Sequence, residues 1–145
     1  MQLRNLVLKA CLGLTVLSFS SLALAQYKLT NLVSNQVKQA RHDDPFLVNA
    51  WGLVYAPGSP FWISDNGSGW STLYSNIGVA HALKVGVPGA KDGVKGSPTG
   101  IVFNRSSEFN VQGWPAIFLF ATLDGTISGW APHSNKSGHH RGEQR

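Results

Sequence analysis

The chain of 145 residues is poor in cysteine, in charge and in helical periodicity. Its one cysteine, Cys11, lies in a segment that we expect to be removed, so the mature chain has no disulfide and no thiolate ligand for a metal. Only 13% of the residues are charged. After residue 25, no stretch sustains the i, i+3, i+4, i+7 apolar spacing of an amphipathic helix. The fold must therefore be held by an apolar core, and we expect that core to be built from strands.

Motifs for the common chemistries are also missing. No Gly-Lys-Ser or Gly-Lys-Thr occurs, so a phosphate-binding loop is not predicted, and no Gly-x-Ser-x-Gly marks a nucleophilic serine. None of the five histidines forms a His-x3-His pair, the helical spacing of a zinc site. The sequence thus offers no catalytic motif and predicts no resident cofactor, with calcium as the one exception considered below.

The first 25 residues have the three parts of a secretory signal peptide. Arg4 and Lys9 form a basic start, an apolar run follows over 10–24, and Ala23-Leu24-Ala25 is a small-x-small cleavage site. A transmembrane anchor is the alternative, but the run is short and interrupted by serines. We expect export by a Sec-type route to the periplasm or the medium, with a mature chain that starts at Gln26.

The mature chain carries ten basic and seven acidic side chains, a net charge of +3 once Arg4 and Lys9 are removed. The basic residues are scattered and form no dense block. Nucleic-acid binding is therefore not predicted.

A hairpin pattern occurs twice and is the strongest signal in the chain. Each copy has a glycine-led apolar strand, a second strand, an Asn-Gly or Asp-Gly turn and a third strand. The segments are Trp51–Tyr55, Phe61–Gly67 and Ser71–Ser75 in the first copy, and Thr99–Phe103, Phe118–Gly125 and Thr126–Trp130 in the second. A repeat of about 40–50 residues made of short strands is typical of a β-propeller blade. The predicted fold class is all-β.

The pattern also predicts local details. Ala82–Val87 is expected to be a fourth, outer strand of the first copy, and Tyr27–Val33 a weak entering strand. Asn66-Gly67 is the signal for a type I′ turn, which needs positive φ at both central residues. The side chains predicted to be most buried are those of Trp51, Leu53, Tyr55, Ile63, Ile101, Phe103, Phe118 and Phe120.

The domain prediction is two blades over residues 26–130, followed by a polar tail over 131–145. A closed propeller needs roughly four to eight blades. The sequence therefore predicts an incomplete β-propeller of about two blades, whose uncovered sheet faces are an aggregation liability. A truncated product is one interpretation, and a short form that self-associates is the other.

Residues 31–132 resemble an uncharacterised family of secreted bacterial proteins that are predicted propellers, distantly similar to NHL-repeat propellers. The matching segments are Asn31–Asn35, Asp44-Pro45, Asn49–Leu53, Phe61–Gly67, Ser97–Asn104 and Phe118–Trp130. The resemblance implies a β-propeller whose members continue past the segment matching Gly129–Pro132. It implies no activity that can be carried over to particular positions.

Oxygen ligands recur at the predicted strand ends, at Asp65, Asn104 and Asp124. Lactonase-like propellers hold calcium in their channel with such groups, and calcium takes six to eight oxygens. Two blades supply too few, and Asp124-Gly125 is already accounted for by turn geometry. A structural role in turns is the favoured interpretation. A metal-assisted lactonase-like or other hydrolase remains the alternative function.

The five tryptophans are many for a chain of this length, and tryptophan rings stack on sugars and anchor partners. Trp51 and Trp62 lie within the strand pattern and are expected to fill the space between blades. Trp70 and Trp114 lie near loops and are the candidates for contact with an extracellular glycan or protein. The favoured function is accordingly a secreted, non-catalytic binding or interaction scaffold.

Overall fold

The computed structural model describes residues 27–132, and these residues form strands and loops with no helix. The all-β prediction is confirmed. The strands are β1 (Val33–Ser34), β2 (His42–Asp43), β3 (Ala50–Tyr55), β4 (Phe61–Asp65), β5 (Trp70–Tyr74), β6 (Val85–Gly86), β7 (Pro98–Phe103), β8 (Asn110–Val111), β9 (Trp114–Pro115), β10 (Phe118–Thr122) and β11 (Ile127–Trp130). The predicted signal peptide and residues 133–145 of the predicted tail lie outside the described residues.

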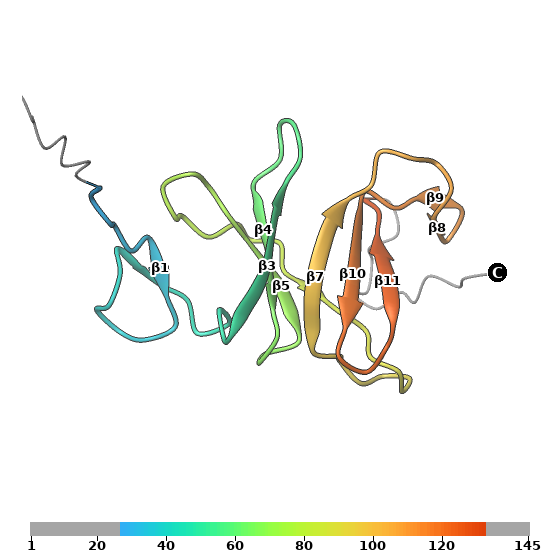
Figure 1. The fold of residues 1–145 in the computed structure, drawn as a ribbon, viewed down its shortest axis with the longest axis horizontal. Coiled ribbons are helices and arrows are strands. Elements are labelled where there is room, and N and C mark those ends of the chain that lie inside the picture. The colour runs from blue at the N-terminus through green and yellow to red at the C-terminus, as the bar shows by residue number, and fades with distance from the viewer. Residues whose placement is uncertain (1–26, 133–145) are drawn as a thin grey trace, which may run out of the picture.

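Two antiparallel sheets form the body of the structure (Figure 1). The first sheet has the order β3-β4-β5-β6, and the second has the order β11-β10-β7. Each sheet corresponds to one copy of the hairpin pattern. The expected outer strand over 82–87 is present as the shorter β6, paired with β5. Within 27–33, only Val33 belongs to a strand, so most of the expected entering strand is irregular chain.

The turn between β4 and β5 differs from the type I′ prediction. Neither Asn66 nor Gly67 has positive φ, whereas Gly69 does, at 71°. The amides of Ser68 and Gly69 both donate to the carbonyl of Asp65, which makes a longer turn that ends in the left-handed residue. Gly67 serves a different need, since a Cβ there would lie 2.7 Å from Cγ1 of Val48. Asn66-Gly67 thus marked the position of the hairpin turn correctly, but the predicted type I′ geometry was wrong.

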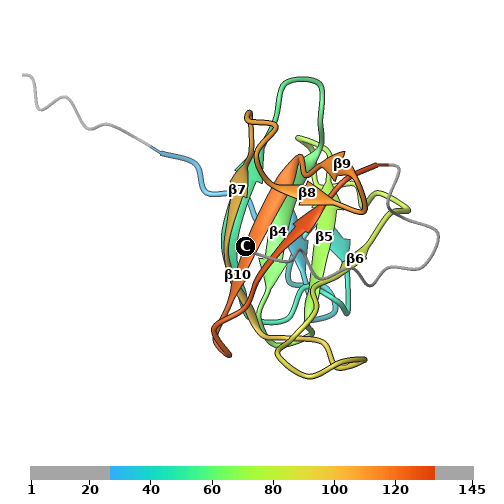
Figure 2. The same cartoon turned by 90° about the vertical axis from the view of Figure 1, so that its right-hand side faces the viewer.

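The two sheets pack face to face, and Trp62 lies at the centre of the contact. Its ring stacks on Phe118 at a centroid distance of 4.2 Å and lies 4.8 Å from Trp130. Its Nε1 donates to the hydroxyl of Ser59, so the buried indole has a polar partner. The sheets stand side by side in Figure 1, and the second overlies the first in Figure 2. The core contains Trp62, Leu73, Val85, Val87, Ile101, Phe118 and Phe120.

The core prediction is confirmed for the second sheet and wrong for β3. Ile101, Phe118 and Phe120 are buried, and Phe103 and Ile63 are half-buried. In contrast, Trp51, Leu53 and Tyr55 are 57%, 63% and 55% exposed. Side chains alternate between the two faces of a strand. The face of β3 that carries these three residues is turned away from the second sheet, and no other sheet of the described chain covers it.

Gly52 sets how closely the two sheets approach. β3 lies beside β7, and a Cβ at Gly52 would be 2.6 Å from the carbonyl oxygen of Thr99 and 3.0 Å from the amide of Ile101. Real Cβ atoms do not reach such distances to backbone, so glycine is needed here for close packing rather than for its φ freedom.

The position of Trp62 gives a direct test of the sheet packing. Trp62→Ala should lower the free energy of unfolding by about 3–5 kcal/mol, because it opens a cavity between the sheets. Trp51→Ala, the matched control, should cost less than about 1 kcal/mol because Trp51 is largely exposed. Urea denaturation followed by circular dichroism measures both values. Equal losses for the two variants would contradict the arrangement of the sheets.

Candidate functional site

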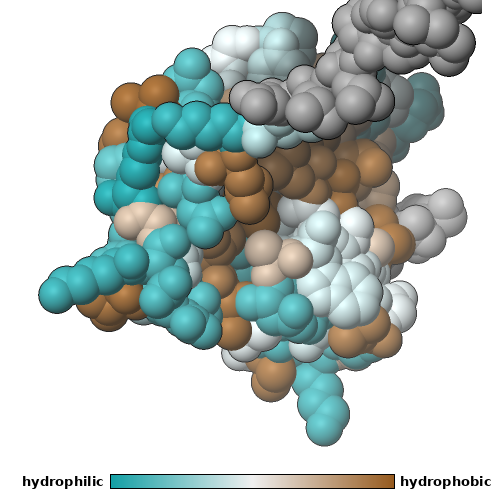
Figure 3. Space-filling model, turned by 60° about the vertical axis from the view of Figure 1, so that its left-hand side comes forward, coloured by the Kyte–Doolittle hydropathy of each residue, from teal (hydrophilic) through white to brown (hydrophobic). Residues whose placement is uncertain are grey.

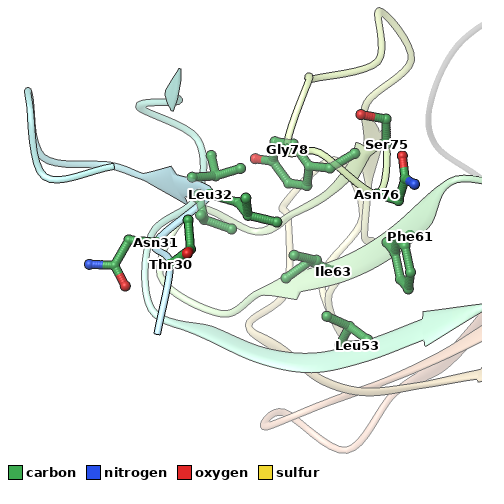
Figure 4. A pocket seen from close by; sticks show the side chains of 12 residues that line it. Thr30, Asn31, Leu32, Leu53, Phe61, Ile63, Ser75, Asn76 and Gly78 are labelled. Atoms are coloured by element: carbon green, nitrogen blue, oxygen red, sulfur yellow. The ribbon is translucent and has the colours of Figure 1, made fainter. Parts of the chain in front are cut away.

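An apolar cleft lies on the outer face of the first sheet, where the N-terminal segment (residues 27–49) approaches it. The cleft has a volume of about 490 Å³. Figure 3 shows apolar side chains gathered in a hollow that hydrophilic residues border. In Figure 4, Leu32 forms part of one wall, and Leu53 and Ile63 come from the sheet on the other side. The full lining is Thr30, Asn31, Leu32, Val33, Leu47, Leu53, Phe61, Ile63, Tyr74, Ser75, Asn76 and Gly78.

Backbone hydrogen bonds hold the N-terminal wall in place. β1 and β2 pair in parallel, and the amide of His42 donates to the carbonyl of Leu32. The side-chain amide of Asn31 donates to the carbonyl of Gln39 at 3.3 Å, which closes the loop between the two strands. Gly78 lets this unit approach the chain after β5, since a Cβ there would lie 2.9 Å from the Cβ of Leu32. The wall is therefore tied both to itself and to the first sheet.

A buried polar contact fastens the same segment to β5. The Tyr74 hydroxyl donates to Oδ2 of Asp44 at 2.8 Å, while Oδ1 of Asp44 accepts the amide of Phe46 at 2.9 Å. Asp44 is only 8% exposed and Tyr74 only 3%. Burial is the main cause that raises the pKa of Tyr74 above its ordinary value. The phenol therefore stays protonated and acts as a donor to Asp44.

Asp65 lies on the same face and is fully buried. Its Oδ2 accepts hydrogen bonds from the amide and the hydroxyl of Thr72, at 3.1 and 2.7 Å. Its Oδ1 has no hydrogen-bond partner within the described chain. Burial raises the pKa of Asp65 to about 7, the bonds from Thr72 oppose this shift, and the nearby Asp44 adds to it. Near neutral pH this carboxyl is close to its midpoint of protonation.

The three candidate metal ligands do not form one site. Asn66 donates to the carbonyl of Pro98, and Thr122 pairs with Pro98, so Asp65 and Asp124 both lie near the start of β7. Asn104 follows the opposite end of that strand. Among residues 27–132, no three or more His, Cys, Asp or Glu side chains gather where a metal ion could be held.

Asn104 and Asp124 each organise a local turn. The Asn104 amide donates to the carbonyl of Ala116 at 2.9 Å, and its oxygen accepts from Ser106. Asp124 accepts the Thr122 hydroxyl through Oδ1 and the Ala90 amide through Oδ2. The bond from Thr122 is the main cause that lowers the pKa of Asp124. Both side chains act as the favoured turn interpretation expects.

The two candidate contact tryptophans have different surroundings. Trp70 belongs to β5 and is half-buried, with the edge of Phe46 on its ring and the Lys95 ammonium 4.0 Å from the ring centroid. Trp114 belongs to β9 and is 49% exposed. Of the two, Trp114 presents more of its ring to solvent. Neither lines the cleft.

The cleft itself was missed by the sequence analysis. Its sheet wall was assigned to the buried core, because apolar residues at alternate strand positions look the same whether or not a second sheet covers them. The sequence feature that could have indicated the cleft is the apolar pair Leu32-Val33, which the strand pattern placed in an entering strand.

Comparison with known proteins supplies relatives but no function. No protein-family model matches the chain, and no solved structure matches it. The chain is similar to an uncharacterized protein of Acanthamoeba polyphaga mimivirus, 29% identical over 114 residues, which are 76% of this chain and 28% of the relative. A second uncharacterized protein of this virus is 30% identical over 90 residues, 62% of this chain and 24% of the relative. The chain thus spans about a quarter of the length of these curated relatives.

The buried carboxyl of Asp65 predicts a dependence of stability on pH. The folded state keeps this proton up to about pH 7, whereas the unfolded state releases it near the ordinary value of 3.8. The Asp65 carboxyl therefore contributes its full stabilisation below pH 3.8, and this contribution is lost as the pH rises from there to about 7. Asp65→Asn should remove this loss and make the protein more stable than wild type at pH 8. Thermal unfolding from pH 4 to pH 8 measures the effect.

Asp124→Asn is the control, because the contribution of Asp124 to stability should change with pH in the opposite direction to that of Asp65. A lowered pKa stabilises the fold above the unfolded-state value, and that gain disappears as the pH falls. This variant should therefore be less stable than wild type at neutral pH, with the gap closing in acid. Parallel pH profiles for wild type and Asp65→Asn would show that the Asp65 carboxyl is not buried as described.

Proposed function

We propose that this protein is a non-catalytic binding or interaction scaffold that works outside the cytoplasm, built from propeller-like blades. The observation that carries the proposal is the apolar outer face of the first sheet, with its cleft. Leu53 and Tyr55 are more than half exposed there, next to the half-buried Phe61 and Ile63. Contiguous apolar surface of this kind marks sites of association in soluble proteins.

The chemistry of the cleft favours a protein partner. Its walls are mostly aliphatic and aromatic, and two of the polar side chains that line it are already engaged. Ser75 accepts the amide of Val79 at 3.1 Å, and Asn31 donates to Gln39. A sugar needs hydrogen-bonding groups directed at its hydroxyls, whereas an apolar side chain needs only a dry concave surface. The partner we propose is therefore a protein that inserts an apolar side chain.

Export and propeller ancestry belong to the same proposal. The three-part leader over residues 1–25 and the resemblance to secreted bacterial propellers support them. Among the described residues, no helix is long and apolar enough to cross a membrane. The lactonase-like alternative has less support, because Asn104 follows the end of β7 opposite to Asp65 and Asp124, and because Asn104 and Asp124 organise local turns.

The cleft can be tested with indole as a stand-in for an apolar side chain. In a methyl NMR titration, indole should shift the signals of Leu32 and Ile63 and leave that of Ile127 unchanged, because Ile127 lies on the other sheet. Leu53→Ser should weaken the binding, since it removes part of the wall. Leu123→Ser is the matched control, because Leu123 is a similarly exposed leucine (64% against 63%) outside the cleft.

A parallel titration with chito- and malto-oligosaccharides separates the two partner classes. Shifts centred on Trp114 with a sugar, and none in the cleft with indole, would replace the proposed protein partner by a glycan. No response to either probe would overturn the proposal that the cleft binds an apolar side chain.

The export proposal makes its own prediction. When the full chain is produced in a bacterial host, the protein recovered outside the cytoplasm should begin at Gln26, because the signal peptidase cuts after Ala25. N-terminal sequencing or intact mass measures this. A product that retains residues 1–25 and stays in the cytoplasm would contradict the leader assignment.

A further inference from the structure

The two sheets repeat each other residue by residue. In the first sheet, Tyr55, Phe61 and Tyr74 lie side by side across β3, β4 and β5. In the second sheet, Phe103, Phe118 and Trp130 lie side by side across β7, β10 and β11. The next row on the same faces matches as well, with Leu53 and Ile63 corresponding to Ile101 and Phe120.

The corresponding faces have different surroundings. On the second sheet these positions receive the first sheet, so Ile101 is 7% exposed and Phe118 is 2% exposed. On the first sheet the corresponding residues Leu53 and Tyr55 are 63% and 55% exposed. Tyr74, on the same face of β5, is only 3% exposed because Asp44 and the N-terminal segment pack on it. The first sheet thus presents the same face, here called the receiving face, with its β3 side open in the described chain.

The opposite face of each sheet is repeated as well. It is called the donating face here, because that face of the first sheet packs on the receiving face of the second sheet. Within the chain, the donating face of the first sheet carries Val54 and Trp62, which pair with each other. The corresponding pair on the outer face of the second sheet is Val102 and Leu119. Val102 is 55% exposed, and Ile127, on the same face at the other edge of the sheet in β11, is 39% exposed. One molecule therefore carries an exposed donating face on the second sheet and a receiving face on the first sheet that is open over β3.

Gly100 supports this correspondence independently. It matches Gly52, the residue that lets β3 approach β7. A Cβ at Gly100 would meet nothing within 4 Å, and Gly100 does not have positive φ. Neither crowding nor backbone conformation within the described chain requires glycine here. A strand that approached Gly100 as β7 approaches Gly52 would require it.

We propose that the partner of the apolar face is a second copy of this chain, joined head to tail. The outer face of the second sheet of one copy packs on the outer face of the first sheet of the next, with β7 against β3. Gly100 and Val102 of one copy then lie against Leu53 and Tyr55 of the other. This inference rests on the proposed function, because it names the partner of the same face.

The N-terminal segment covers the β5 side of this face, where the buried Tyr74 donates to Asp44. The part of the face that stays open lies over β3, at the opposite edge of the sheet from β5 and β6. Inside the chain, the closest approach between sheets is also at the first strand, where Gly52 meets Thr99. Because the interface is heterologous, it repeats until a ring closes or a filament grows. A closed ring of roughly four to eight blades would hold roughly two to four copies.

Sedimentation velocity on the purified full chain over a wide range of concentrations tests the proposal. Wild type should form species larger than the monomer. Gly100→Ala should be monomeric, because the added Cβ would collide with the approaching strand. Its thermal stability should equal that of wild type, whereas Gly52→Ala should be clearly less stable. Leu53→Asp should also be monomeric, because it places a charge on the receiving face.

A mixing experiment separates this geometry from a symmetric dimer. Gly100→Ala keeps the receiving face and Leu53→Asp keeps the donating face, so an equimolar mixture should contain dimers although each variant alone is monomeric. Val94→Asp is the control, because Val94 is a 53% exposed apolar residue that lies in a loop outside both faces; it should associate like wild type. If Leu53→Asp fails to fold, Tyr55→Ser takes its place, and Val102→Asp provides a second variant of the donating face.

Three results would overturn the proposal: a wild type that is monomeric at every concentration, association lost in Leu53→Asp but kept in Gly100→Ala, or a mixture that stays monomeric. If indole still binds the cleft in any of these cases, the scaffold function stands and its partner is a different protein. If association follows the prediction but indole does not bind, the head-to-tail contact is supported and the binding of an apolar side chain in the cleft is not.

Discussion

The stacking of Trp62 on Phe118 and Trp130 is the contact on which the rest of the structure depends. It joins two short antiparallel sheets that would each be marginal alone, because a few strands with one wet apolar face bury too little surface. Gly52 makes the contact possible by admitting β7 to within close range of β3. Once the inner faces are joined, the outer faces are left with apolar side chains and no second sheet within the described chain. Because both units repeat the same strand pattern, the apolar residues that pack the inner faces recur on the outer faces, where they are exposed.

The polar groups buried between the sheets oppose this packing. The hydroxyls of Ser64, Ser71 and Ser128 and the Nε1 of Trp130 have no hydrogen-bond partner within the described chain. A buried polar group without a partner costs about 1–3 kcal/mol. The contacts around Asp44 work in the other direction, because they pair a carboxylate with the Tyr74 hydroxyl and fasten the wall of the cleft. Hydrogen bonds therefore hold the N-terminal wall of the cleft, and the repeated strand pattern supplies the apolar residues of its sheet wall.

Much of the secondary structure was predictable, because alternation and turn residues act locally. The strands over 50–55, 61–65, 98–103 and 118–122 were located to within two residues, and the outer strand of the first sheet was expected. The type I′ turn was not correct, because Gly67 is needed for its contact with Val48 and Gly69 supplies the positive φ. Such a contact is non-local, and no local pattern reports it. The cleft was missed for the same reason, since its two walls come from segments that meet only in the folded chain.

What the sequence by itself determined is the alternation that makes both faces of each sheet apolar, and with it the all-β class and the two-unit repeat. Leu53 and Ile101 occupy matching places in that pattern, and so do Gly52 and Gly100. Only the tertiary structure decided that Ile101 is covered and Leu53 is exposed, and that Gly52 meets a strand while Gly100 meets nothing. The physical reason is that periodicity encodes which side chains share a face, whereas the burial of that face depends on what packs against it.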